Sequence, residues 1–146
     1  MQQFTFGLSL WIPYFGTGFN SVDPYGFSSQ MTPAPGIGLD VARIESDSRQ
    51  VRRLIGEWRS VAPLYYGDFY PLAPYGTEPT AWMAWQFESP AEDQGMIQAF
   101  RRAGRRFETA RFHLSFLKAS ASYAMRDLDS EKESRHTGKE LMEIGK

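Results

Sequence analysis

Side chains that could do chemistry are sparse in this sequence, and their spacing argues against several kinds of site. His113 and His136 stand too far apart in the chain to indicate a metal site, and there is no cysteine to supply a thiolate. Ser9 and Ser115 lack the surroundings of a nucleophilic serine. The triplet Gly16-Thr17-Gly18 lacks the lysine and the length of a phosphate-binding loop. We therefore expect no metal and no cofactor.

An arginine cluster straddles the turn at Gly104 and consists of Arg101, Arg102, Arg105 and Arg106. No aromatic stripe accompanies these charges on one face, so a solvated hairpin is favoured over a phosphate or nucleic-acid patch. The chain of 146 residues carries 16 basic and 17 acidic side chains, a formal net charge of −1. A balance this close to neutral argues against a nucleic-acid partner bound through global charge.

The composition is that of a folded domain, with 42% hydrophobic and 23% charged residues. Four Trp, seven Tyr and 11 Phe stand beside 13 Gly and nine Pro, a combination that suits strands and ligand-lined loops. No apolar run approaches the roughly 20 residues of a membrane span, and the first residues lack a signal-peptide pattern. We expect no membrane partner, and the compartment stays open, with the cytoplasm as the default.

The first half of the chain predicts alternating strands and helices. Residues 6–12 form a nearly continuous apolar run closed by Pro13, which is typical of a strand buried on both faces. A short helix is expected over residues 24–31, with Asp23 as its cap, and a second strand over residues 36–39. With the helix described next, this alternation indicates parallel β/α units.

The strongest helical pattern lies at residues 47–62, and Pro63 ends it. Ser46 or Asp47 can cap the first turn. We expect the apolar stripe of this helix to be buried against the first two strands. The members of the stripe recur at three- and four-residue intervals, and they are Val51, Leu54, Ile55, Trp58 and Val61.

The second half, from about residue 68, predicts short antiparallel strands. Apolar and polar residues alternate over residues 110–116 and over residues 83–87, and residues 96–100 and 123–128 are further candidates. Such strands at this spacing indicate a small sandwich or barrel. A capping-box pattern at Thr137-Gly138-Lys139-Glu140 predicts a short final helix.

Several motifs in order along the chain resemble the C-terminal part of a melibiase-type α-galactosidase, near glycoside hydrolase family 36. In the first half they are Phe6-Gly-Leu-Ser-Leu-Trp-Ile-Pro-Tyr-Phe-Gly-Thr-Gly18, Asp23-Pro-Tyr-Gly-Phe27, Glu57-Trp-Arg59 and Tyr65-Tyr-Gly-Asp68. In the second half they are Trp82-Met-Ala-Trp-Gln-Phe87, Gly95-Met-Ile-Gln-Ala-Phe-Arg-Arg102 and Gly138-Lys-Glu-Leu-Met142. The likeness covers nearly the whole chain.

The resemblance implies an α+β fold, with the terminal β/α units of a (β/α)8 barrel followed by an antiparallel β-sandwich-like domain. Residues 1–67 are then similar to the last two barrel units, and residues 68–146 to a β domain that is shortened at its end. The family uses two catalytic carboxylates on earlier barrel strands, and these have no counterpart here. The resemblance therefore points to an α-galactosidase and leaves the chain's own activity open.

Active sites of such barrels lie at the C-terminal ends of the strands. On that rule Trp11 and Tyr14, beside the loop at residues 16–18, and Asp40, after the second strand, would face the sugar. An aromatic ring can stack on a sugar, and a carboxylate can accept hydrogen bonds from two hydroxyls. The alternative is that Trp11 and Tyr14 are packing residues and that Asp40 caps a turn. For Asp23 a helix cap is favoured.

A glycosidase pair within this chain would need two carboxyl groups about 5–5.5 Å apart for retention, or about 6.5–9.5 Å apart for inversion. No pair of carboxylates in the first half has a diagnostic spacing, so we expect no catalytic residue here. The candidates considered are Asp23, Asp40, Glu45, Asp47, Asp68 and Glu78.

Two functions remain open from the sequence. In one, the chain contributes a sugar-binding wall and a barrel-bracing β domain to an α-galactosidase-like hydrolase, with an α-galactoside or related sugar as its ligand. In the other, it is a stand-alone carbohydrate-binding or structural β module without turnover. Two β/α units leave strand edges and an apolar face uncovered. We therefore expect self-association, or pairing with the missing barrel segment.

Overall fold

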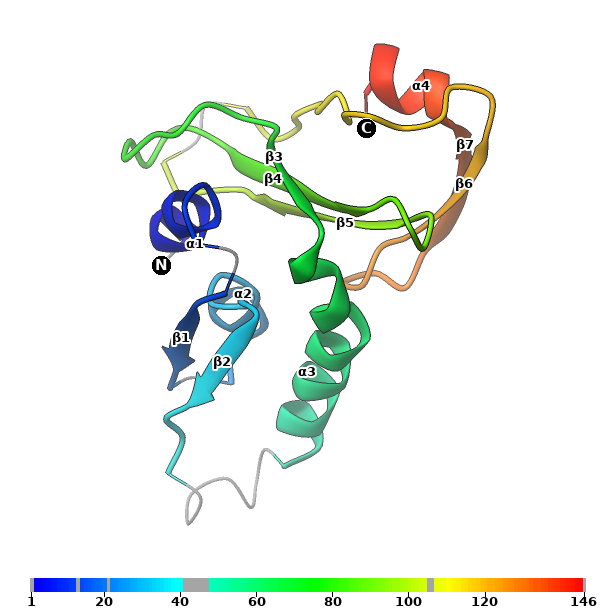
Figure 1. Cartoon of the computed structure of the whole chain (residues 1–146). Coiled ribbons are helices and arrows are strands. Elements are labelled where there is room, and N and C mark those ends of the chain that lie inside the picture. Colours follow the sequence, from blue (N-terminus) through cyan, green and yellow to red (C-terminus); the bar gives the residue numbers. More distant parts are fainter. Residues whose placement is uncertain (1, 13, 21, 41–47, 105–106, 146) are drawn as a thin grey trace.

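A computed structural model describes residues 2–12, 14–20, 22–40, 48–104 and 107–145. Within those ranges the strands form a parallel pair β1–β2, a three-stranded antiparallel sheet in the order β3-β4-β5, and an antiparallel pair β6–β7 (Figure 1). Helices accompany each sheet, so the architecture belongs to the α+β class, as the sequence predicts. No helix of the described ranges is long and apolar enough to cross a membrane.

The prediction of a strand at residues 6–12 is wrong, because the chain forms helix α1 (Gln2–Ser9) there. In the helix, Phe6 points into the core, and its ring lies 5.8 Å from Phe69 and 6.0 Å from Trp85. A short apolar run does not distinguish a strand from a helix that buries one side. A helix satisfies its backbone hydrogen bonds within itself, which a strand without a neighbour cannot do.

Strands β1 (Gly16–Phe19) and β2 (Ala34–Ile37) are parallel and joined through helix α2 (Pro24–Ser28). The parallel β/α connection is as predicted, but the first strand begins at Gly16 instead of residue 6. Asp23 caps α2 as expected, and its Oδ2 accepts a hydrogen bond of 2.6 Å from the Gly26 N–H. A Cβ at Gly16 would lie 2.6 Å from the Ala34 carbonyl oxygen, so this pairing needs glycine.

Helix α3 (Ser48–Val61) confirms the predicted helix, and the 3-10 turn η2 (Ala62–Tyr66) follows it. The proposed caps Ser46 and Asp47 lie outside the described residues. Leu54 is buried in the core shared with Phe19, and the other members of the stripe are half-buried. Trp58 Nε1 donates a hydrogen bond of 2.9 Å to the Thr32 carbonyl, which holds α3 against the segment that leads into β2.

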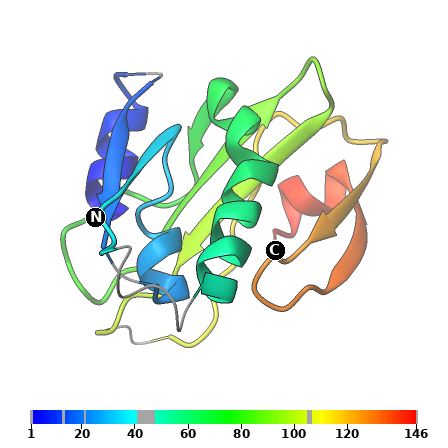
Figure 2. The ribbon, with the colours of Figure 1, turned by 90° about the horizontal axis from the view of Figure 1, so that it is seen from below.

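The three-stranded sheet consists of β3 (Asp68–Pro71), β4 (Met83–Ser89) and β5 (Gln94–Phe100), and it confirms the strands predicted at 83–87 and 96–100. Figure 2 shows helices α2 and α3 in front of this sheet, with β6, β7 and α4 to one side. Trp85 and Phe87 of the central strand face the helices and belong to the core. The alternate residues Gln86 and Glu88 point to the opposite face and are buried as well.

Strands β6 (Ser122–Arg126) and β7 (Glu133–Thr137) form a hairpin, and helix α4 (Gly138–Glu143) follows β7 directly. The predicted capping box is present. Glu140 N–H donates to Thr137 Oγ1 at 3.2 Å, and Thr137 N–H donates to a Glu140 carboxylate oxygen at 2.8 Å.

The prediction of a strand at residues 110–116 is wrong, because that segment is irregular. We call residues 110–118 the strap. Gln86 binds the strap in place of a neighbouring strand: Ser115 N–H donates to Gln86 Oε1 at 2.9 Å, and Gln86 Nε2 donates to the Ser115 carbonyl at 3.0 Å. Leu114 N–H donates to the Leu141 carbonyl at 3.0 Å. The alternation correctly marks Leu114 as buried, but the strap's hydrogen-bond partners lie on a side chain and on a helix.

Candidate functional site

A hollow of 230 Å³ opens beside Trp11, and we call it the Trp11 hollow. Its walls come from the turn after α1, the residues just before β1 and β2, and the junction of η2 with β3. Phe15 and Pro33 lie next to the N-terminal ends of the two parallel strands, so the hollow lies at that end of the pair. The lining is mainly apolar and aromatic, and Asp68 adds the one acidic residue.

Trp11 is 86% exposed, the highest value among the large apolar side chains of the described ranges. The backbone N–H of Trp11 donates to the Leu8 carbonyl at 3.0 Å, so the residue lies in the turn that ends α1. The uncovered indole is part of the lining of the hollow. Its role as a sugar-contact residue stays a prediction.

Tyr14 is also exposed, and its ring stacks on that of Tyr66 with centroids 6.1 Å apart and planes 16° from parallel. Tyr14 does not line the Trp11 hollow, but it precedes Phe15, which does. The two tyrosines therefore form an exposed aromatic surface at the same end of the parallel pair as Trp11.

Asp40 is exposed and follows the C-terminal end of β2, whereas Trp11 and Tyr14 precede the N-terminal end of β1. The expectation that all three lie at the C-terminal ends of strands is therefore wrong for the two aromatics. The reason is the position of the first strand, which starts after Tyr14 instead of before Trp11. Four paired residues separate the two ends, roughly 10 Å of strand.

Tyr65 lies at the base of the Trp11 hollow and is buried. Its hydroxyl donates a hydrogen bond of 3.3 Å to Gln98 Oε1. Burial raises the pKa of Tyr65 well above its ordinary value of 10.0, so this phenol stays neutral and is no base at physiological pH. The lining offers aromatic rings for stacking and the Asp68 carboxylate for hydrogen bonding.

Two of the carboxylates considered for a glycosidase pair have partners within the chain. Asp23 is occupied as a helix cap, and Asp68 accepts a hydrogen bond of 3.4 Å from the Tyr70 hydroxyl. Glu45 and Asp47 lie outside the described residues. Within the ranges the structure describes, no three His, Asp or Glu side chains are grouped so that they could hold a metal ion.

Glu88 is an acidic residue that the sequence analysis missed. It is 7% exposed and stands directly opposite Asp68 in the β3–β4 register. Gln86 Nε2 donates to Glu88 Oε2 at 3.3 Å. Burial raises the pKa of Glu88, the bond from Gln86 opposes that rise, and Asp93 and Asp68 add to it. In the sequence, the one sign that Glu88 is buried is that it lies two residues after Gln86, on the same face of a strand.

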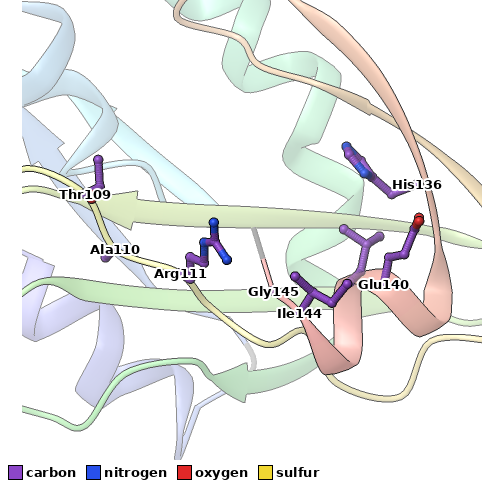
Figure 3. A pocket seen from close by; sticks show the side chains of 8 residues that line it. Thr109, Ala110, Arg111, His136, Glu140, Ile144 and Gly145 are labelled. Atoms are coloured by element: carbon purple, nitrogen blue, oxygen red, sulfur yellow. The ribbon is translucent and has the colours of Figure 1, made fainter.

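A second hollow, of 510 Å³, lies between the strap, β7 and α4. Figure 3 shows Arg111 on the strap, His136 on β7 and Glu140 on α4 around one open space. Glu140 is already used by the capping box, and the hydrogen bonds from Thr137 lower its pKa, so it remains ionised. The strap and the continuous β7–α4 segment lie far apart in sequence, which explains why no local pattern indicated this hollow.

No protein-family model matches the chain, and no curated sequence matches it. Solved structures do match. The GH36 α-galactosidase AgaB from Geobacillus stearothermophilus has a TM-score of 0.66 and 18% identity, over 89% of this chain and 18% of that one. The galactosidase domain of the α-galactosidase–sucrose kinase AgaSK has a TM-score of 0.62 and 22% identity, over 83% and 16%. A variant of AgaA from G. stearothermophilus, in complex with 1-deoxygalactonojirimycin, has a TM-score of 0.61 and 20% identity, over 83% and 16%.

These matches show a shared fold. The chain folds like a region of α-galactosidase structures, as the resemblance of its motifs predicts, and it spans less than a fifth of the length of each. At this level of identity the likeness concerns the path of the backbone and leaves the side-chain chemistry to be argued from this chain's own residues.

Proposed function

We propose that this chain is the C-terminal portion of an α-galactosidase-like glycoside hydrolase and that it forms part of the wall of a sugar site. The observation that carries the proposal is the shared fold with three α-galactosidase structures over 83–89% of the chain. The exposed indole of Trp11 beside an aromatic hollow supports it further, because flat rings bind the apolar faces of sugars.

The proposal divides the chain at residue 67. Residues 1–67 correspond to the last two β/α units of a barrel, which the parallel pairing of β1 with β2 around α2 supports. Residues 68–146 correspond to a β domain that braces the barrel, and the antiparallel sheets support this part. The open edges of the parallel pair are the surface at which a preceding barrel segment, or a second copy of the chain, would pair.

The three proposed contact residues act at two places. Trp11 stacks on a sugar ring at the mouth of the hollow, and Tyr14 extends that surface. Asp40 accepts hydrogen bonds from hydroxyls at the other end of the parallel pair. Because the two places are separated by the length of the strands, one sugar ring does not reach both. The ligand class that fits is an α-galactoside or related sugar of more than one residue.

Sugar binding is tested by titrating the chain with melibiose while following tryptophan fluorescence. Trp11 is far more exposed than the other indoles, so we expect it to dominate the change. In Trp11→Phe the change should disappear, whereas in Phe107→Ala, which removes another exposed ring, it should persist. An unchanged titration in Trp11→Phe would remove Trp11 from the proposed site.

Catalysis is tested with an activated aryl α-galactoside. We expect no turnover by this chain, because loss of the members of a catalytic unit costs many orders of magnitude and the two family carboxylates have no counterpart here. Turnover that vanishes in Asp40→Asn would contradict this expectation. The second function, a non-catalytic carbohydrate-binding or structural β module, predicts the same inactivity, and the fluorescence titration decides whether sugar is bound at all.

A further inference from the structure

The face of the three-stranded sheet that points away from the helices carries polar side chains in cross-strand pairs. Asp68 stands opposite Glu88, and Tyr70 stands opposite Gln86. The strap crosses this face. Both the nitrogen and the oxygen of the Gln86 side-chain amide form hydrogen bonds with the backbone of Ser115. This polar face is separate from the core, and the Trp11 hollow receives no aromatic ring from it.

Phe116, the next residue of the strap, combines two unfavourable features. Its side chain is 77% exposed, and its backbone has φ of +57°, in the left-handed region that bulky residues rarely adopt. Glycine would adopt this backbone conformation without strain, and a polar side chain would be well solvated at this exposed position. Strained residues of this kind gather at binding sites, where the surrounding structure holds them in place.

The ring of Phe116 is held against Tyr70, with centroids 4.7 Å apart and planes 30° from parallel. On one side of Phe116 the strap is fixed by Gln86 at Ser115. On the other side Lys118 is fixed twice. Its N–H donates to the Tyr123 hydroxyl at 3.0 Å, and its ammonium binds the Asp93 carboxylate at 2.5 Å. The outer face of the Phe116 ring is therefore presented to solvent in a defined orientation.

Hydrogen-bonding groups lie beside the two rings. The Tyr70 hydroxyl donates to Asp68 Oδ2 at 3.4 Å, which places this carboxylate at the edge of the ring pair. A carboxylate beside an exposed ring can accept hydrogen bonds from sugar hydroxyls while the ring stacks on the sugar's C–H face. We propose that Tyr70, Phe116 and Asp68 form a second saccharide-binding site, the Tyr70–Phe116 platform, on the outer face of the sheet.

A saccharide fits this platform better than a protein partner does. The exposed apolar surface consists of one ring supported by another, whereas protein interfaces centre on a larger apolar patch. The exposed polar neighbour along the sheet is Asp68, whose carboxylate suits a hydroxyl group and not an apolar partner. Asp68 also lines the Trp11 hollow, but neither ring of the platform does, and the platform contains none of the proposed contact residues Trp11, Tyr14 and Asp40. The site therefore goes beyond the proposed function.

The test is an NMR titration of the chain with methyl α-D-galactopyranoside and with melibiose, following the backbone amides of residues 115–118. We expect saturable shifts there with at least one of the two sugars. In Phe116→Gly the ring is lost while the backbone strain is relieved, so binding should weaken by about tenfold or more as the midpoint of thermal unfolding holds or rises.

Two controls keep the result decisive. Trp11→Phe should leave the shifts at residues 115–118 unchanged, so failure of the Trp11 site and failure of the platform give different patterns. Asp68→Asn should weaken platform binding while the protein remains folded. Absence of sugar-dependent shifts at the strap up to the solubility limit would overturn the proposal. So would shifts that follow protein concentration alone, because these would assign the platform to contact with a second copy.

Discussion

The central antiparallel strand is buried and hydrogen-bonded to neighbouring strands more completely than the two strands of the parallel pair. Residues Met83 to Glu88 of β4 are all buried, and β4 is paired on both sides, with β3 and with β5. In β1 and β2 each strand is paired on one side within the described residues, and Gly16, Gly18 and Ile37 are exposed. The antiparallel sheet is a complete core, whereas the parallel pair depends on few buried contacts.

Those few contacts are specific. Phe19, at the end of β1, is 3% exposed and meets the ring of Phe27 on α2 edge-on at 4.5 Å. Both belong to the same cluster as Leu54 and Trp85, as does Met31 before β2, and Leu39 after β2 packs against that cluster. This difference indicates that the antiparallel sheet contributes more to the stability of the fold than the parallel pair does.

The largest effect is expected at Trp85. Its side chain is fully buried, its Nε1 donates to Gln98 Oε1 at 2.8 Å, and its ring meets Phe6 and Phe100. Trp85→Ala should lower the free energy of unfolding by about 3–5 kcal/mol, a large part of the roughly 5–15 kcal/mol typical of a domain. Chemical denaturation followed by fluorescence measures this loss.

The matched control is Ile37→Ala on β2, where the side chain is 56% exposed. A surface substitution of this kind should change the free energy of unfolding by no more than about 0.5 kcal/mol. Equal losses at the two positions would contradict the contrast between the complete sheet and the open pair.

The elements that could be predicted are those with a clear local pattern in the sequence. The strands β4 and β5 and the helices α3 and α4 carry their own local patterns: alternation, a 3.6-residue stripe with Leu54 inside, and a capping box at Thr137. Residues 6–12 have no such period, and the backbone folded as a helix that inserts Phe6 into the core. The position of β1 could not be foreseen, because Gly16 and Gly18 carry no hydrophobic pattern.

The candidate site was predictable only in part, for the same reason. Trp11 is exposed beside an aromatic hollow, as a contact residue should be, but Asp40 lies at the far end of the pair because β1 starts late. The second hollow, which Arg111, His136 and Glu140 line, and the Tyr70–Phe116 platform both depend on the path of the strap. That path is held by hydrogen bonds at Leu114, Ser115 and Lys118. Gln86, which binds Ser115, lies 29 residues away and leaves no trace in local spacing.

The second prediction concerns that glutamine. Gln86→Ala removes both hydrogen bonds to Ser115 and leaves a part-buried N–H and carbonyl without their partner. Unsatisfied groups of this kind cost about 1–3 kcal/mol, so we expect a loss of about 2 kcal/mol. Hydrogen exchange should show faster exchange at Ser115, while the amides of β4 and β5 remain protected. Uniform acceleration across the sheet would show that the strap is part of the core.

The third prediction tests the cap of helix α4. Thr137→Ala removes the hydroxyl that accepts from Glu140 N–H, and it should cost about 1 kcal/mol. Thr137→Ser keeps the hydroxyl and should be nearly neutral. Circular dichroism during denaturation measures both variants. An equal loss in Thr137→Ser would attribute the effect to the methyl group and not to the cap.

The smallest expected effect is a pH dependence at Glu88, which lies in the most buried strand. Burial raises its pKa in the folded protein above the usual 4.5, so the folded state holds this proton more tightly than the unfolded state does. Its favourable contribution is fully present below pH 4.5 and is lost as the pH rises through the folded-state pKa. Above the folded-state pKa, burial of the ionised carboxylate therefore opposes folding.

Glu88→Gln removes this charge and keeps a side chain of similar shape beside Gln86. The variant should be more stable than the parent at pH 7, and its advantage should shrink as the pH falls toward 4, where Glu88 is protonated in both states. Asp127 and Glu140, whose pKa values are lowered by hydrogen bonds, lose stabilising charge as the pH falls through their ordinary values of 3.8 and 4.5. They titrate equally in both proteins, so the difference between two denaturation series from pH 4 to 8 isolates Glu88. A difference that stays constant with pH would mean that Glu88 is solvated in the folded protein, and the outer face of β4 would then be as open as the parallel pair.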